Sequence, residues 1–88
     1  MKEMDELEKH LKDNGYLYKR DCQYDGEQII VYDSRGKRQW DAVCCCFSYG
    51  HKDGLLEIMG TIVKDKKMEV EGYLTAQDII ERLEETKC

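Results

Sequence analysis

The sequence predicts a single α+β domain over residues 1–88, a two-layer fold in which an antiparallel meander sheet of four to five strands lies between an N-terminal and a C-terminal helix. Both ends of the chain show apolar residues at three- and four-residue spacing, which is typical of amphipathic helices. The middle of the chain alternates short β-branched and aromatic runs with turns that contain Asp and Gly. No linker or repeat divides the chain, and 88 residues support one hydrophobic core. The predicted order is α-β-β-β-β-β-α, with both helices on one face of the sheet.

The first predicted element is a helix from about Lys2 to Asn14. Its apolar residues Met4, Leu7 and Leu11 fall on one helical face. Acidic residues crowd the first turns, and an Asn-Gly pair follows as a stop signal. Because the apolar stripe is narrow, we expect this helix to pack against another element.

Three strands are expected next, over residues 16–22, 28–32 and 37–49. The Asp25-Gly26 pair separates the first two strands and is a signal for a tight turn. The segment 33–36, which begins with Asp and ends with Gly, is typical of a type I turn between the second and third strands.

Two further strands are predicted over residues 55–63 and 68–73, after a break at 50–54 and before and after a turn at 64–67. Apolar residues in these strands alternate with Glu or Thr, as in strands with one wet face. The side chains expected to point to the core are Leu56, Ile58, Ile62, Met68 and Val70.

The last element is a helix from about Ala76 to Thr86. Thr75 is the expected N-cap, and Asp78 stands where a capping box places its acidic residue. Leu74 and Ile79 have the spacing of a hydrophobic staple. The buried stripe of this helix is expected to consist of Ile79, Ile80 and Leu83.

Three of the five cysteines are consecutive, in the run from Val43 to Phe47. Side chains alternate between the faces of a strand, so an extended chain would divide these thiols between two faces. The core face would hold Trp40, Ala42, Cys44, Cys46 and Ser48. The other face would hold Val43, Cys45, Phe47 and Tyr49, next to Ile29 and Val31 or their neighbours. We interpret Val43, Cys45, Phe47 and Tyr49 as a surface for a protein partner or for self-association, unless a loop or the first helix covers it.

No catalytic, cofactor-binding or metal-binding residue is assigned from the sequence, and no cofactor is expected. The chain lacks a C-x-x-C pair, and thiols on opposite strand faces cannot converge on one metal ion. Buried cysteine acting as a small apolar residue is the favoured interpretation. The alternative is a small-ligand or metal-binding protein, or a minor enzyme, that uses Cys44, Cys46 and His51.

Charge and hydropathy limit the partners further. The net charge is −5, which disfavours nucleic acid, because phosphate contacts need clustered Lys and Arg. The first ten residues are highly charged and lack the apolar region of a signal peptide. No apolar run approaches the roughly 20 residues that cross a bilayer. We therefore expect no membrane partner and a cytoplasmic location, where thiols stay reduced.

Two segments, QWDAVCCCFSYGHKDGLLEIMG (39–60) and GYLTAQDIIERL (72–83), resemble parts of small uncharacterised proteins from phages and mobile elements of gut Firmicutes. The resemblance covers about half of the chain, and the Cys45-Cys46 pair departs from its pattern. It implies a bacterial, phage-related protein and brings no catalytic residues. The resulting hypothesis is a non-enzymatic protein-interaction module, such as a regulator or inhibitor of a protein partner encoded by a phage or mobile element.

Overall fold

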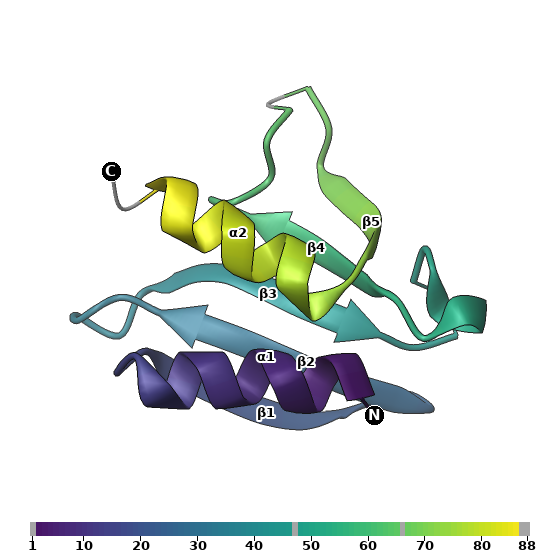
Figure 1. Cartoon of the computed structure of the whole chain (residues 1–88), viewed down its shortest axis with the longest axis horizontal. Helices are drawn as coiled ribbons and strands as arrows, with labels where there is room; N and C mark the ends of the chain where they lie inside the picture. Colours follow the sequence, from purple (N-terminus) through teal and green to yellow (C-terminus); the bar gives the residue numbers. More distant parts are fainter. Residues whose placement is uncertain (1, 47, 66, 87–88) are drawn as a thin grey trace.

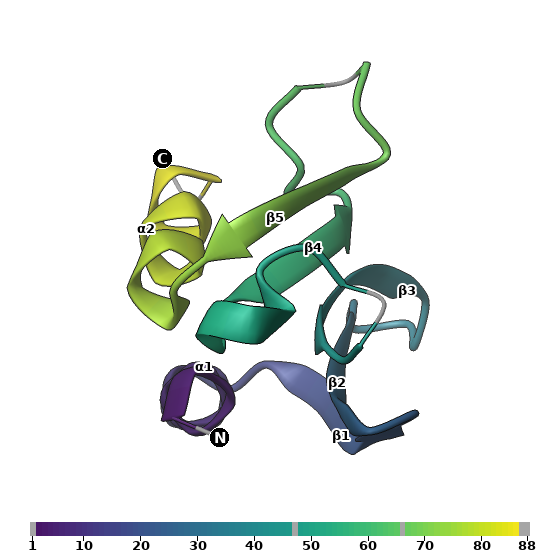
Figure 2. The same ribbon diagram turned by 90° about the vertical axis from the view of Figure 1, so that its right-hand side faces the viewer.

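The computed structural model describes residues 2–46, 48–65 and 67–86 and confirms the predicted order of elements (Figure 1). The elements are α1 (Lys2–Asp13), β1 (Leu17–Gln23), β2 (Gly26–Tyr32), β3 (Arg38–Cys44), a 3-10 helix (His51–Asp53), β4 (Leu56–Gly60), β5 (Val70–Leu74) and α2 (Ala76–Thr86). The five strands form one antiparallel sheet in the order β1-β2-β3-β4-β5. Both helices lie on the same face of this sheet, as Figure 2 shows, so the fold is the expected two-layer α+β arrangement. No helix in the described part of the chain is long and apolar enough to span a bilayer.

The hydrophobic core lies between the helices and the sheet. Ile29 and Val31 belong to this core, so of the two predicted sets it is their neighbours, such as Ile30, that lie on the opposite face with Val43. The register explains the difference, because Ile29 lies opposite Ala42, and Val31 lies opposite Trp40. Residues opposite each other in a ladder share a face. The core residues are Met4, Leu7, Leu11, Ile29, Val31, Trp40, Ala42, Cys44, Leu56, Ile58, Ile62, Val63, Ala76, Ile79 and Leu83.

The third strand ends at Cys44, five residues before the predicted end. A turn begins there, in which the Ser48 hydroxyl donates to the Cys45 carbonyl (2.9 Å) and accepts from the Cys45 N–H (3.0 Å). The Asp25 carboxylate also accepts the Cys46 N–H at 2.7 Å. Because the chain leaves the sheet, strand alternation no longer applies, and Cys46 is exposed instead of joining the core.

The last two strands are also shorter than predicted. Their connection leaves the sheet after Gly60 and projects beyond it (Figures 1 and 2). Gly60 has a φ of 114°, and a Cβ there would lie 2.5 Å from the Gln39 carbonyl oxygen, so only glycine fits this exit. Met68 lies in the connection and is 56% exposed, so its predicted core position is wrong.

The final helix begins as predicted. The Thr75 hydroxyl accepts from the Asp78 N–H (3.1 Å), and the Asp78 carboxylate accepts from the Thr75 N–H (2.9 Å). This reciprocal pair is a capping box, which satisfies two N–H groups at the helix start. The bounds of α2, Ala76 to Thr86, match the predicted bounds of this helix.

Candidate functional site

The structure describes three of the four residues predicted as a partner surface, and these three differ in exposure. Val43 is half-buried in β3, Cys45 is buried at 4% exposure, and Tyr49 is 59% exposed. Phe47 lies outside the described residues. Of the three that the structure describes, only Tyr49 is a large, well-exposed apolar side chain.

The face of the sheet opposite the helices is of mixed polarity. Ile30 and Met59 lie on either side of Asp41 in one row across the strands. The Asp41 carboxylate is nearly buried, accepts a hydrogen bond from Gln28 (2.6 Å) and forms an ion pair with Arg38 (2.9 Å). Alternation of charged, amide and apolar side chains is typical of a wet sheet face. Among the residues that the structure describes, this face therefore lacks a continuous apolar patch.

The cysteine and histidine residues of the alternative hypothesis are separated in the fold. Cys44 lies in the core, whereas Cys46 and His51 line a shallow depression with Ser48. Within the described residues, no group of three or more His, Cys, Asp or Glu side chains is placed to hold a metal ion.

The environment of these thiols disfavours nucleophilic chemistry. Burial raises the pKa of Cys44. Desolvation, followed by the hydrogen bond between the thiol and the Asp25 carboxylate, raises the pKa of Cys46. Because the thiolate is the reactive species, both cysteines are poorer nucleophiles than an ordinary thiol at neutral pH.

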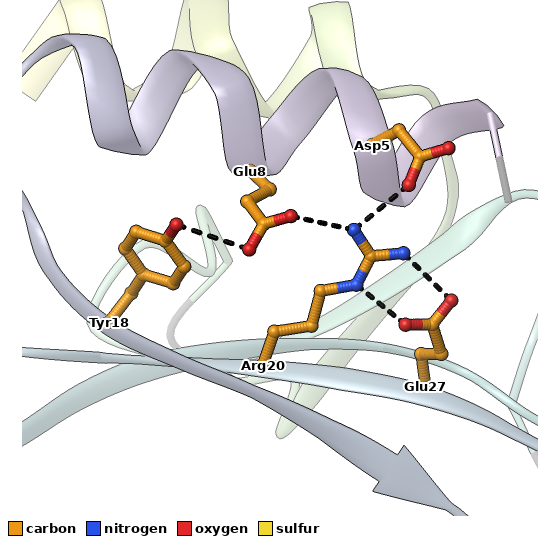
Figure 3. A network of polar contacts seen from close by, with 5 residues as sticks. All are labelled: Asp5, Glu8, Tyr18, Arg20 and Glu27. Carbon is orange, nitrogen blue, oxygen red and sulfur yellow. Dashed lines mark hydrogen bonds and ion pairs between the residues drawn. The ribbon is translucent and has the colours of Figure 1, made fainter.

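A part-buried polar cluster joins α1 to the β1–β2 hairpin (Figure 3). The Arg20 guanidinium donates two hydrogen bonds to the Glu27 carboxylate, at 2.6 and 2.8 Å. It also contacts Glu8 and Asp5 on α1, each at 2.9 Å. The Tyr18 hydroxyl donates to the second oxygen of Glu8 at 3.1 Å. Hydrogen bonds from Arg20 lower the pKa of both Glu27 and Asp5, so the cluster stays ionised and holds the first helix in place.

A groove of about 620 Å³ lies beside β5. Its volume lies within the range of ligand and peptide sites. Tyr49, Met68 and Tyr73, which are 59%, 56% and 63% exposed, line it. Its remaining apolar lining comes from Val63 and Val70.

Tyr49 and Tyr73 are brought together by the turn after β3. The Tyr73 N–H donates to the Tyr49 carbonyl (3.4 Å), and the two rings lie 6.5 Å apart. The Tyr49 N–H donates to the Glu57 carboxylate of β4 at 2.7 Å. A Cβ on Gly72 would lie 2.4 Å from the Cβ of Tyr49, so glycine is required for this close approach.

Arg82 of α2 fixes the opposite wall of the groove. Its guanidinium donates to both oxygens of Glu71 (2.9 and 2.8 Å) and to the Ile62 carbonyl (2.8 Å). The Lys64 N–H donates to the same carboxylate at 3.3 Å. The hydrogen bonds from Arg82 lower the pKa of Glu71, and the contacts together tie the β4–β5 connection to β5 and α2.

Sequence reasoning did not identify Tyr73 and assigned Met68 to the core. One signal could have found them, because the last strand of a meander lies at the sheet edge and has a neighbour on one side only. Large apolar side chains in and before such a strand are then candidates for a surface groove.

Comparisons with known proteins add no family assignment. The chain matches no protein-family model, and no curated protein and no solved structure shows significant similarity to it.

Proposed function

We propose that this protein is a non-enzymatic protein-interaction module that regulates or inhibits a protein partner, and that it binds through the groove beside β5. The observation that carries the proposal is the gathering of Tyr49, Met68 and Tyr73, each more than half exposed, around one apolar groove. Aromatic residues and methionine are enriched at the centre of protein interfaces. Exposed apolar patches of this kind mark interaction sites more often than chance surface residues do.

Contacts beside the groove support the same function. Arg82 holds Glu71 of the groove lining, and a backbone hydrogen bond joins Tyr73 to Tyr49. Anchors that are already in place lose little conformational entropy on binding. We further propose a cytoplasmic location, which suits the four free thiols of the described chain.

The test is affinity capture with wild-type protein and two matched variants. Met68→Ser/Tyr73→Asn removes two groove side chains, and Tyr24→Asn removes another exposed tyrosine from the β1–β2 turn. Both tyrosines have a positive φ, 59° and 54°, which Asn tolerates well, so both variants should fold. A partner would be identified by mass spectrometry and its binding then measured with purified proteins.

We expect wild type and Tyr24→Asn to bind this partner equally. The groove variant should bind it about tenfold more weakly or worse, as when interface anchors are removed. A directly bound partner whose affinity is the same for the groove variant would refute the groove as the contact surface.

A further inference from the structure

The net charge of the protein lies entirely on its helices. The segment of α1 carries five acidic and three basic residues, and α2 carries four acidic residues and one arginine. These net charges, −2 and −3, equal the whole −5, so the rest of the chain is neutral with ten acidic and ten basic residues. Two copies would therefore repel each other if their helical layers met, whereas contact at the edge of the sheet would bring no net charges together.

Charged residues of both signs lie at both ends of the groove. Lys52 and Asp53 line the depression that shares Tyr49 and Tyr73 with the groove. At the other end, the described charged residues are Lys64, Asp65, Lys67 and Glu69. Lys52, Lys64 and Lys67 make no ion pair within the described chain. Each end thus presents both signs of charge to an incoming molecule.

The two edges of the sheet differ in their protection. The β1 edge carries the exposed charged residues Lys19 and Asp21, as edges that avoid pairing often do. The β5 edge carries one charged residue, Glu71, whose carboxylate is bound by Arg82. Four of the six large, exposed apolar side chains of the described chain lie on or beside the last two strands: Tyr49, Met59, Met68 and Tyr73.

We propose that the partner of this groove is a second copy of the chain, related by a two-fold axis beside the two β5 strands. The inference rests on the proposed function, because it names the occupant of the same groove. In an antiparallel arrangement, the Lys52-Asp53 end of each copy meets the 64–69 end of the other. Both ends carry both signs, so the surface is complementary to itself. A two-fold contact also gives a closed dimer and no longer assembly, because each copy uses the same patch.

The test is the mass of the reduced protein by light scattering and sedimentation, from about 1 µM to about 1 mM, the usual range of weak association. Wild type and Tyr24→Asn should pass from one chain to two within this range. Met68→Ser/Tyr73→Asn should dimerise at least about tenfold more weakly. Lys64→Glu/Lys67→Glu keeps the apolar surface and makes one end predominantly acidic, so it should also weaken the dimer.

Two outcomes would overturn this inference. One is a wild-type protein that remains monomeric at every concentration, and the other is a dimer whose strength is unchanged in Met68→Ser/Tyr73→Asn. A wild-type monomer that still binds a different protein through the groove would refute the dimer alone and leave the proposed function intact. A groove-dependent dimer without any other partner would support the dimer and contradict the regulatory function. Circular dichroism of each variant would confirm that it is folded.

Discussion

The Glu3 carboxylate of α1 accepts a 2.6 Å hydrogen bond from the backbone N–H of Ala76, the first residue of α2. The contact joins two residues 73 positions apart and places negative charge at a helix N-terminus, where the helix dipole favours it. We expect Glu3→Ala to lower the free energy of unfolding by about 1–2 kcal/mol, as the loss of a helix cap does. Urea unfolding followed by circular dichroism measures the change. Glu6→Ala, at an exposed site in the same helix, should cost less than about 0.5 kcal/mol, and equal losses would contradict the role of the bond.

Replacement of Arg20 should destabilise the protein more than replacement of an exposed cation on the same strand. Arg20 is 18% exposed and is surrounded by three carboxylates, which Arg20→Met would leave without their cation. We expect a loss of about 1–3 kcal/mol at pH 7, below the value for a fully buried pair because water reaches the cluster. Lys19→Met breaks an exposed pair with Asp21 and should cost at most about 0.5 kcal/mol.

The effect of Arg20→Met should depend on pH. The hydrogen bond from Arg20 lowers the pKa of Glu27 from its ordinary value of 4.5. A carboxyl group with a lowered pKa stabilises the folded state fully when the pH is above its pKa in the unfolded chain. This stabilisation is lost as the pH falls through the pKa of the group in the folded protein. The difference between wild type and Arg20→Met should therefore be constant near neutral pH and shrink below pH 4.5. A difference that grows on acidification would contradict the assignment.

The left-handed backbone conformation at Tyr73 can be tested by comparing two variants that both lack the aromatic ring. Tyr73 has a φ of 59°, a region in which glycine is favoured over residues with a Cβ. We expect Tyr73→Gly to be more stable than Tyr73→Ala by about 1 kcal/mol, since both lack the ring. In an ordinary strand, Ala would be the more stable of the two. Thermal unfolding of both variants decides between these conformations.

The three consecutive cysteines should differ in their tolerance of charge. Cys44 and Cys45 are 1% and 4% exposed, so Cys44→Asp and Cys45→Asp each bury a carboxylate. We expect losses of about 3 kcal/mol or more for both, because a charged group would replace a small apolar side chain in a buried position. Cys46→Ser, at an exposed position, should change the free energy of unfolding by about 0.5 kcal/mol or less. If Cys45→Asp lowered the free energy of unfolding no more than Cys46→Ser, the buried position of Cys45 in the turn after β3 would be refuted.

The reactivity of Cys46 should increase when Asp25 loses its charge. Desolvation and the hydrogen bond to the Asp25 carboxylate both raise the pKa of the Cys46 thiol. Asp25→Asn keeps an oxygen that can accept the Cys46 N–H, and it removes the negative charge. Alkylation of Cys46 by iodoacetamide near pH 8, followed by mass spectrometry, should become several-fold faster. The rate at exposed Cys22 on β1 serves as an internal reference and should stay the same.

Local patterns were sufficient for most of the architecture. The start of α2 follows from Thr75 and Asp78, because a capping box acts within one turn of the chain. The 3.6-residue period of Met4, Leu7 and Leu11 likewise identified the buried face of α1. The predicted meander of five strands follows from turn residues that act over three or four positions. These features are determined by neighbours in the sequence, and they are the ones that the structure confirms.

Contacts between distant residues decided the rest. Asp25 and Ser48 end β3 at Cys44, and the pairing register places Ile29 and Val31 in the core. The groove depends on Tyr49 meeting Tyr73 and on Arg82 of α2 holding Glu71, contacts that span 11 to 24 positions. Strand alternation states only which side chains share a face, not where pairing stops or which face the helices cover. The sequence by itself therefore determined the elements and their order, whereas the tertiary structure decided the faces and the groove, because these depend on packing between segments far apart in the chain.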